Sequence, residues 1–202
     1  MKFFTLIVIL NTYLCFIQSV AAQVGEDFFF QKGVEVSWCN DTIVFYNRKI
    51  KGDEQIEAKL VAFNIKSGQS FTFPHNHRLI SSLAFNDFIV SVTLDGQITG
   101  FTKTGELIQN LMHKSRGEGY LSACKLSDDG TFVVLTLLPT GHKKIKTYVL
   151  DFIKINNDNF FEFKRLIPKT SIGYGKLVYY LERLWLLEKD KATQIDFSEI
   201  SF

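Results

Sequence analysis

The sequence predicts an all-β fold built from about four repeats of one small sheet. After the first residues, the chain shows few helical stripes and many short β-branched and aromatic runs separated by Gly, Asn and Asp. Four of these runs align through Ile43, Ile89, Val133 and Leu177, which are 46, 44 and 44 residues apart. A period of about 45 residues with four strands in each repeat is typical of a β-propeller blade.

Each repeat is expected to begin with one strand and a polar turn, followed by the aligned run as the second strand. The expected first strands are Val34 to Trp38, Ile80 to Phe85, Leu121 to Leu126 and Ser171 to Tyr174. Their turns are expected at Asn40-Asp41, Asn86-Asp87, Ser127 to Gly130 and Gly175-Lys176. The aligned second strands are TIVFY, FIVSV, FVVLT and KLVYY.

A third strand, a further turn and a fourth strand complete each repeat. The expected third strands are KLVAFNI, QITGFT, KTYVLDFI and RLWLL, and the fourth are SFTF, LIQNL, FEFKRL and TQIDF. This divides the propeller-like domain into repeats of about 33–76, 77–118, 119–168 and 169–202. One twisted four-stranded sheet cannot bury both apolar faces alone, so neighbouring blades must stack. Four blades could close as a small ring or form part of a larger one, and a β-sandwich or barrel is the alternative fold.

Residues 1–22 are predicted to be a secretory signal peptide. Lys2 precedes the apolar run Phe3 to Ile17, and Val20 and Ala22 offer the small side chains that signal peptidase requires. An uncleaved membrane anchor is the alternative, but the run is short for a bilayer span of about 20 residues. We therefore expect residues 23–202 to form one domain that is secreted, periplasmic or in the lumen of the secretory pathway, without a stable membrane span after cleavage.

Two cysteines and one glycosylation motif follow the predicted signal. In an oxidising compartment Cys39 and Cys124 could form a disulfide, which requires Cα atoms within about 7 Å. Two separately buried thiols are the alternative. The motif Asn40-Asp41-Thr42 is an N-glycosylation acceptor in a eukaryotic host and also reads as an ordinary turn.

Two stretches carry a resemblance to a known group of propellers. Residues 95–107, DGQITGFTKTGEL, and residues 59–71, KLVAFNIKSGQSF, resemble the repeat of pyrroloquinoline-quinone-type propellers within the WD-repeat-like superfamily. The resemblance implies a propeller fold, which this group uses for cofactor enzymes and for cofactor-free binding scaffolds of the bacterial envelope. Phe71 and Ile108 stand where each quinoprotein repeat usually has tryptophan, and the adjacent cysteine pair is absent. We therefore expect no quinone or other cofactor.

Basic residues gather on the loops expected at one end of the sheets. In an antiparallel meander, the loops after second and fourth strands share one end, and the turns after first and third strands share the other. The first group forms the predicted partner-binding face: Arg48, Lys49, His75, His77, Arg78, His113, Lys114, Arg116, His142, Lys143 and Lys144. Such a face would attract a protein or acidic ligand, more strongly at lower pH. Ordinary solvated loops are the alternative.

The opposite end is expected to carry acidic turns. It gathers Asp41, Asp87, Asp128, Asp129, Asp158, Glu188 and Asp190, with Lys66, Lys103, Lys176, Lys189 and Lys191 among them. The formal net charge of the whole chain is only +2, and it falls further when Lys2 leaves with the signal. We therefore expect no binding to nucleic acid. The oligomeric state is left open by the sequence.

Candidate metal and catalytic groups are few. Alternation in the segment PHNH places His75 and His77 on one side, and His113 would be the third ligand of a metal. Two histidines without a nearby third usually lie in a solvated loop, so we expect no metal. The chain has no GxSxG, HExxH or phosphate-loop motif, and we assign no catalytic residue.

The predicted function is therefore binding or scaffolding rather than catalysis. A glycan-acting enzyme on a propeller scaffold and a truncated propeller without independent function are the alternatives. Trp38 and Trp185 lie in predicted strands, which favours core packing over stacking on a carbohydrate. An exposed tryptophan would reopen the sugar-binding interpretation.

Overall fold

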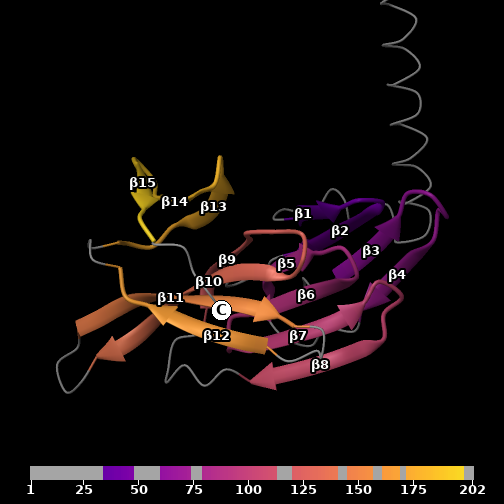
Figure 1. Cartoon of the computed structure of the whole chain (residues 1–202), viewed down its shortest axis with the longest axis horizontal. Helices are drawn as coiled ribbons and strands as arrows, with labels where there is room; N and C mark the ends of the chain where they lie inside the picture. The colour runs from indigo at the N-terminus through magenta and orange to yellow at the C-terminus, as the bar shows by residue number, and fades with distance from the viewer. Residues whose placement is uncertain are drawn as a thin grey trace, which may run out of the picture.

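A computed structural model describes residues 34–47, 60–73, 79–112, 120–140, 145–156, 161–168 and 172–197. These residues form fifteen strands joined by turns (Figure 1). The strands are β1 (Val34–Cys39), β2 (Thr42–Asn47), β3 (Leu60–Asn64), β4 (Ser70–Phe73), β5 (Leu79–Ala84), β6 (Phe88–Thr93), β7 (Gln97–Thr102), β8 (Leu107–Met112), β9 (Tyr120–Lys125), β10 (Thr131–Thr140), β11 (Ile145–Ile155), β12 (Phe161–Leu166), β13 (Lys176–Tyr180), β14 (Arg183–Leu187) and β15 (Ala192–Ile195). Within this part of the chain, no helix is long and apolar enough to cross a lipid bilayer.

The strands form four small antiparallel sheets in a four-bladed β-propeller arrangement, as the sequence predicts. Blade 1 is β1-β2-β3-β4, blade 2 is β5-β6-β7-β8, blade 3 is β9-β10-β11-β12, and blade 4 is β13-β14-β15. Figure 1 shows the blades succeeding one another in chain order. Tight turns join strands within a blade; for example, Cys39 pairs with Thr42 across a two-residue turn in which Asn40 has φ of 53°. Asparagine tolerates this left-handed backbone conformation, which explains why the chain turns at Asn40-Asp41 as expected.

Three apolar clusters join successive blades. The cluster between blades 1 and 2 includes Val44, Leu60, Phe73, Ile89 and Phe101. The cluster between blades 2 and 3 includes Phe85, Val90, Ile98, Tyr120, Phe132 and Ile153. The cluster between blades 3 and 4 includes Leu135, Phe152, Leu177, Leu184 and Ile195. Blade stacking therefore supplies the burial that a single sheet cannot provide.

The first strand of each blade lies at the propeller axis, and serine side chains tie β1 to β5 and β9 to β13. The Ala84 amide in β5 donates to Ser37 Oγ in β1 at 3.1 Å. The Leu177 amide in β13 donates to Ser122 Oγ in β9 at 3.0 Å. These two hydroxyls accept hydrogen bonds from amides at the free edges of β5 and β13, which no ladder partner satisfies.

Blades 1 and 4 face each other across a seam, which we define by Val36 and Trp38 of blade 1 and Val178, Tyr180 and Leu187 of blade 4. Strand alternation directs these side chains away from the clusters that contain Cys39 and Leu177. Val36, Trp38, Tyr180 and Leu187 are exposed. Among the described residues, no apolar cluster spans this seam.

Blade 4 differs from the sequence prediction. The first strand expected over Ser171 to Tyr174 is wrong, because Ile172 to Tyr174 are not in a strand. The KLVYY segment, expected as the second strand, is instead the axial strand β13, and the blade has three strands in the described residues. A Cβ on Gly175 would lie 2.5 Å from the Leu187 carbonyl oxygen, so the chain enters β13 by passing close to β14.

Candidate functional site

A cavity of about 500 Å³ lies on the axis and is lined by the first strands of all four blades. Its walls are Glu35–Trp38 with Tyr46, Ile80–Leu83, Ser122–Lys125 and Lys176–Tyr179. Because Val36, Trp38 and Val178 also belong to the seam, the cavity extends to the seam between blades 1 and 4. Its size falls in the range of about 300–1,000 Å³ that is common for small-molecule sites.

Hydroxyl groups supply much of the polar chemistry of this cavity. Ser37 and Ser122 accept the interblade hydrogen bonds described above, and each retains its own hydroxyl proton for donation. Tyr46 donates from its hydroxyl to Glu35 Oε2 at 2.9 Å, and Ser81 Oγ lies 3.4 Å from the same hydroxyl. The cavity thus offers both donors and acceptors on strands rather than on loops.

The charged groups of the cavity are paired. Lys176 Nζ lies 3.3 Å from Glu35 Oε2 at the end where β1 and β13 begin. At the other end, Lys125 Nζ donates to Asp128 Oδ1 at 2.5 Å and to the Trp38 carbonyl oxygen at 3.2 Å. The hydrogen bond from Lys125 holds the pKa of Asp128 below its usual range. Each lysine has a carboxylate neighbour, so the lining carries little excess charge.

Trp38 is 67% exposed, so the expectation that it packs in the core is wrong. The side chain shares the seam side of β1 with Val36, whereas Ser37 and Cys39 point towards blade 2. No blade stacks on that side within the described residues, and the indole remains at the cavity wall. Trp185, on β14, is partly buried.

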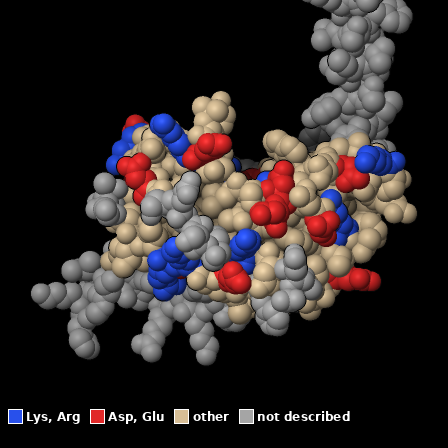
Figure 2. Space-filling model, in the orientation of Figure 1, with Lys and Arg blue, Asp and Glu red and all other residues tan. Residues whose placement is uncertain are grey.

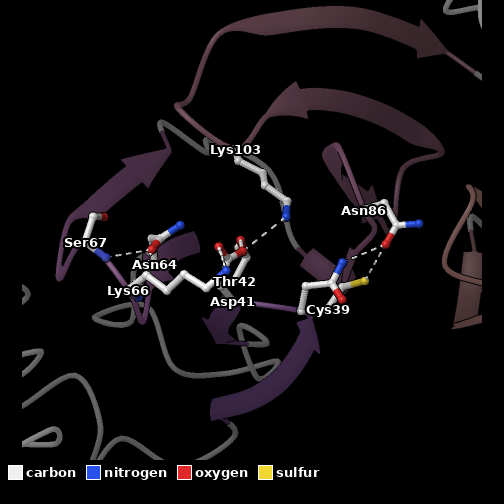
Figure 3. Close-up of polar contacts among 9 residues, drawn as sticks. Cys39, Asp41, Thr42, Asn64, Lys66, Ser67, Asn86 and Lys103 are labelled. Atoms are coloured by element: carbon white, nitrogen blue, oxygen red, sulfur yellow. Dashed lines mark hydrogen bonds and ion pairs between the residues drawn. The ribbon is translucent and has the colours of Figure 1, made fainter.

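Polar contacts join turns of blades 1 and 2 (Figure 3). Asp41 lies between Lys66 and Lys103, with oxygen–Nζ distances of 3.6 and 3.7 Å. Although burial raises the pKa of Asp41, a backbone hydrogen bond and these lysines together lower it below its ordinary value. Asn86 Oδ1 accepts from Asn40 Nδ2 at 2.8 Å and from the Cys39 thiol at 3.5 Å. These contacts tie the two turns together.

An ion pair with a buried carboxylate lies in blade 3, and no sequence pattern predicts it. Asp151 on β11 is 1% exposed. Arg165 on β12 donates from Nε to Asp151 Oδ1 at 2.6 Å and from Nη2 to Asp151 Oδ2 at 2.9 Å. Burial, together with the Asp151 charge, raises the pKa of Tyr120. The bidentate geometry compensates the buried carboxylate, and we assign this group a structural role.

The predicted partner-binding face lies outside the described residues. This applies to Arg48, Lys49, His75, His77, Arg78, His113, Lys114, Arg116, His142, Lys143 and Lys144, and so also to the candidate metal ligands. In the part that is described, no three His, Cys, Asp or Glu side chains form a group that could hold a metal. On the described surface in view, Figure 2 shows basic and acidic side chains close to one another.

One part of the expected charge distribution is wrong. Because β13 is the axial strand, the turn from Glu188 to Lys191 follows the second strand of blade 4 instead of the third. Lys176 begins β13 and contacts Glu35 at the beginning of β1. These residues therefore lie at the end to which the sequence assigned the basic loops, and they bring both acidic and basic groups there.

The two thiols are unbridged and lie in different interfaces. Cys39 belongs to the cluster between blades 1 and 2, and Cys124 packs against the cluster between blades 3 and 4. Cys39 is buried and Cys124 is half-buried in this arrangement. Asn40 is exposed, and its Nδ2, the atom that a glycan would modify, is hydrogen-bonded to Asn86.

Sequence reasoning missed the serine ties. A serine interrupts the middle of three axial strands, in VEVSWC, LISSLA and YLSACK. A polar residue recurring inside otherwise apolar first strands is the signal that could have indicated hydroxyls at the axis. Ser37 and Ser122 are the two that join neighbouring blades.

Comparison with known proteins supports the fold and nothing finer. No protein-family profile and no curated protein matches the chain. Among solved structures, the computationally designed Ika4 protein matches at a TM-score of 0.50 and 13% identity, over 82% of this chain and 93% of that one. BamB from Moraxella catarrhalis has a TM-score of 0.47 and 14% identity, over 83% of this chain and 45% of that one.

Proposed function

We propose that this chain is an exported binding or scaffolding module and that its axial cavity receives part of its partner. The observation that carries the proposal is the cavity of about 500 Å³ to which all four blades contribute. Its walls are strands, and hydrogen bonds to Ser37 and Ser122 tie blade 1 to blade 2 and blade 3 to blade 4, so much of its shape is set before a partner arrives. A preformed site loses less conformational entropy on binding.

The basic loops would complete the partner-binding face. In this proposal the loops carrying Lys114, Arg116, Lys143 and Lys144 attract a protein with an acidic surface, and the cavity receives a protruding part of it. Electrostatic attraction of this kind acts mainly on the association rate and weakens with salt. The two contributions are therefore separable by experiment.

Blocking the cavity tests the proposal. Val36→Arg places a long side chain at the cavity wall, and Ile65→Arg is the matched control because both parent residues are 48% exposed and Ile65 lies outside the cavity lining. Wild-type and variant proteins would be immobilised and exposed to the secreted or periplasmic fraction, and bound proteins would be identified by mass spectrometry. A partner retained by wild type and Ile65→Arg but lost by Val36→Arg supports the proposal. Equal retention by all three overturns it.

A second set of variants tests the loops. Replacing Lys114, Arg116, Lys143 and Lys144 with Glu should slow association of the same partner, and the difference should shrink as salt increases. Association rates measured by surface plasmon resonance at low and high salt would show this. Unchanged rates at low salt would remove the basic loops from the proposal and leave the cavity result standing.

A further inference from the structure

We propose that the axial cavity binds a neutral sugar unit of gluco configuration, stacked on Trp38. The inference rests on the proposed function, since it takes the same cavity as the binding site and names its ligand class. Three observations carry it: an exposed indole at the cavity wall, a mixed set of hydrogen-bonding groups, and paired charges.

The Trp38 indole is placed as a stacking platform. It is 67% exposed and lies near the tip of the β1–β2 hairpin, where it pairs with Ile43, one residue pair from the turn. Its own carbonyl accepts a hydrogen bond from Lys125 at 3.2 Å, so the backbone beneath the ring is fixed from a second blade. A gluco-configured pyranose has equatorial hydroxyls and presents C–H groups on its faces. Such a face can cover an indole without burying a hydroxyl against it.

The polar groups of the same cavity match the rim of a sugar ring. Sugar hydroxyls donate and accept, so a site for them needs both kinds of partner. Ser37 and Ser122 have protons to donate, and Glu35 supplies carboxylate oxygens. These groups lie on strands of blades 1 and 3, which places hydrogen-bonding partners on different sides of one cavity.

The charge balance favours a neutral ligand over an acidic one. Lys176 is paired with Glu35, and Lys125 with Asp128. An anionic ligand in the cavity would meet the Glu35 carboxylate, and the charge of each lysine is already offset by its acidic partner. The basic loops and the cavity therefore select for different chemistry, the loops for acidic surface and the cavity for a neutral, partly apolar unit.

Titration calorimetry with cellotriose and chitotriose tests this inference, with a decamer of glutamate as the acidic probe. We expect one trisaccharide to bind each wild-type chain, and binding of the glutamate decamer to be unaffected by changes in the cavity. Trp38→Ala should weaken trisaccharide binding by about tenfold or more, and Trp38→Phe should restore most of it because a ring remains. Tyr174→Ala is the matched control, since Tyr174 is 62% exposed and lies outside the lining.

The outcomes separate the two proposals. Absence of trisaccharide binding to wild type, or equal binding by wild type and Trp38→Ala, overturns the sugar inference. Loss of glutamate-decamer binding in Trp38→Ala would also overturn it, because the cavity would then hold an acidic peptide. If Val36→Arg still loses its protein partner in these cases, the binding-module proposal stands without the sugar. Circular dichroism of each variant confirms that the sheets are intact.

Discussion

Lys176 Nζ lies 3.3 Å from Glu35 Oε2, and this ion pair joins the axial strands of the first and last blades. The other three junctions between successive blades are apolar clusters. Exposed ion pairs contribute about 0–1 kcal/mol and are weakened by salt. The junction between blades 4 and 1 is therefore held more weakly, within the described residues, than the other three.

Reversing the charge at this junction should loosen it without unfolding the protein. Lys176→Glu places two carboxylates together, and we expect faster hydrogen exchange of the β1 and β13 amides than in wild type. The free energy of unfolding should fall by only about 1 kcal/mol. Lys189→Glu, in an exposed turn of the same blade, is the control for added negative charge. Identical exchange in both variants would show that the ion pair does not hold the junction.

Breaking the Asp151–Arg165 pair in blade 3 should cost more. Arg165→Met leaves the Asp151 carboxylate buried without its cation, and because Arg165 itself is 42% exposed we expect a loss of about 3 kcal/mol, the lower end of the range for a buried pair. Urea denaturation at neutral pH measures the difference. The double variant Asp151→Leu with Arg165→Met should recover much of the stability because no unpaired charge remains. A single variant as stable as wild type would contradict this structural role.

Gly130 should tolerate substitution less well than Gly68. Both have positive φ, of 116° and 70°, but a Cβ on Gly130 would lie 2.8 Å from Phe88 Cζ, whereas a Cβ on Gly68 meets nothing within 4 Å. We expect Gly68→Ala to cost about 1 kcal/mol from backbone strain alone. Gly130→Ala should cost about 3 kcal/mol because Phe88 must also move. Thermal denaturation measures the loss of stability in each variant. Equal losses would contradict the close approach of Phe88 to Gly130.

Acid should remove the stabilisation of the folded state that comes from ionised Asp128. Its pKa is lowered in the folded state, chiefly by the hydrogen bond from Lys125. The stabilisation is therefore complete above the unfolded-state pKa of about 3.9 and is lost as the pH falls through the lower folded-state value. Asp128→Asn should lose less stability than wild type between pH 6 and pH 2 in urea titrations. Lys125→Met removes the same hydrogen bond and should also lose less stability than wild type over this pH range. If both variants lose as much stability as wild type, the Lys125–Asp128 contact does not contribute to the acid response.

The thiols should react slowly in the folded protein. Burial raises the pKa of Cys124 to about 12 and also raises that of Cys39, so few thiolates exist at pH 8. In residues 23–202, a thiol-specific chromogenic reagent should detect two slow thiols in buffer and two fast thiols in denaturant. Failure to detect any thiol in denaturant would establish the disulfide between Cys39 and Cys124 instead.

The repeat could be predicted because its signal is local. Each of Ile43, Ile89 and Val133 lies in a second strand, as expected, where short apolar runs and polar turns mark both ends. The sequence pattern places Leu177 in a second strand because the segment before it also looks like a strand, whereas Leu177 lies in the axial strand β13. The position of a strand within its blade depends on which strand lies at the axis. That is a long-range contact, here from Leu177 to Ser122, and no local pattern encodes it.

The cavity was harder to predict than the blades. The more apolar face of β1 carries Val36 and Trp38, so alternation predicts that this face is buried, whereas the structure leaves Trp38 open and covers Cys39 on the other face. Exposure depends on whether a neighbouring blade packs on that face. The paired charges likewise come from residues far apart in the sequence, such as Glu35 and Lys176.

Apolar clusters join blade 1 to blade 2, blade 2 to blade 3 and blade 3 to blade 4, and in the described residues none joins blade 4 to blade 1. In terms of stability the four blades therefore form a linear array with two ends. In such an array a terminal unit is stabilised by one neighbour and an internal unit by two. Within the described residues, blade 4 has three strands and shares its apolar cluster with blade 3 alone, so it is the unit whose detachment disrupts the fewest contacts. The seam is also the place where an additional repeat could be accommodated without separating any blades that are already packed together.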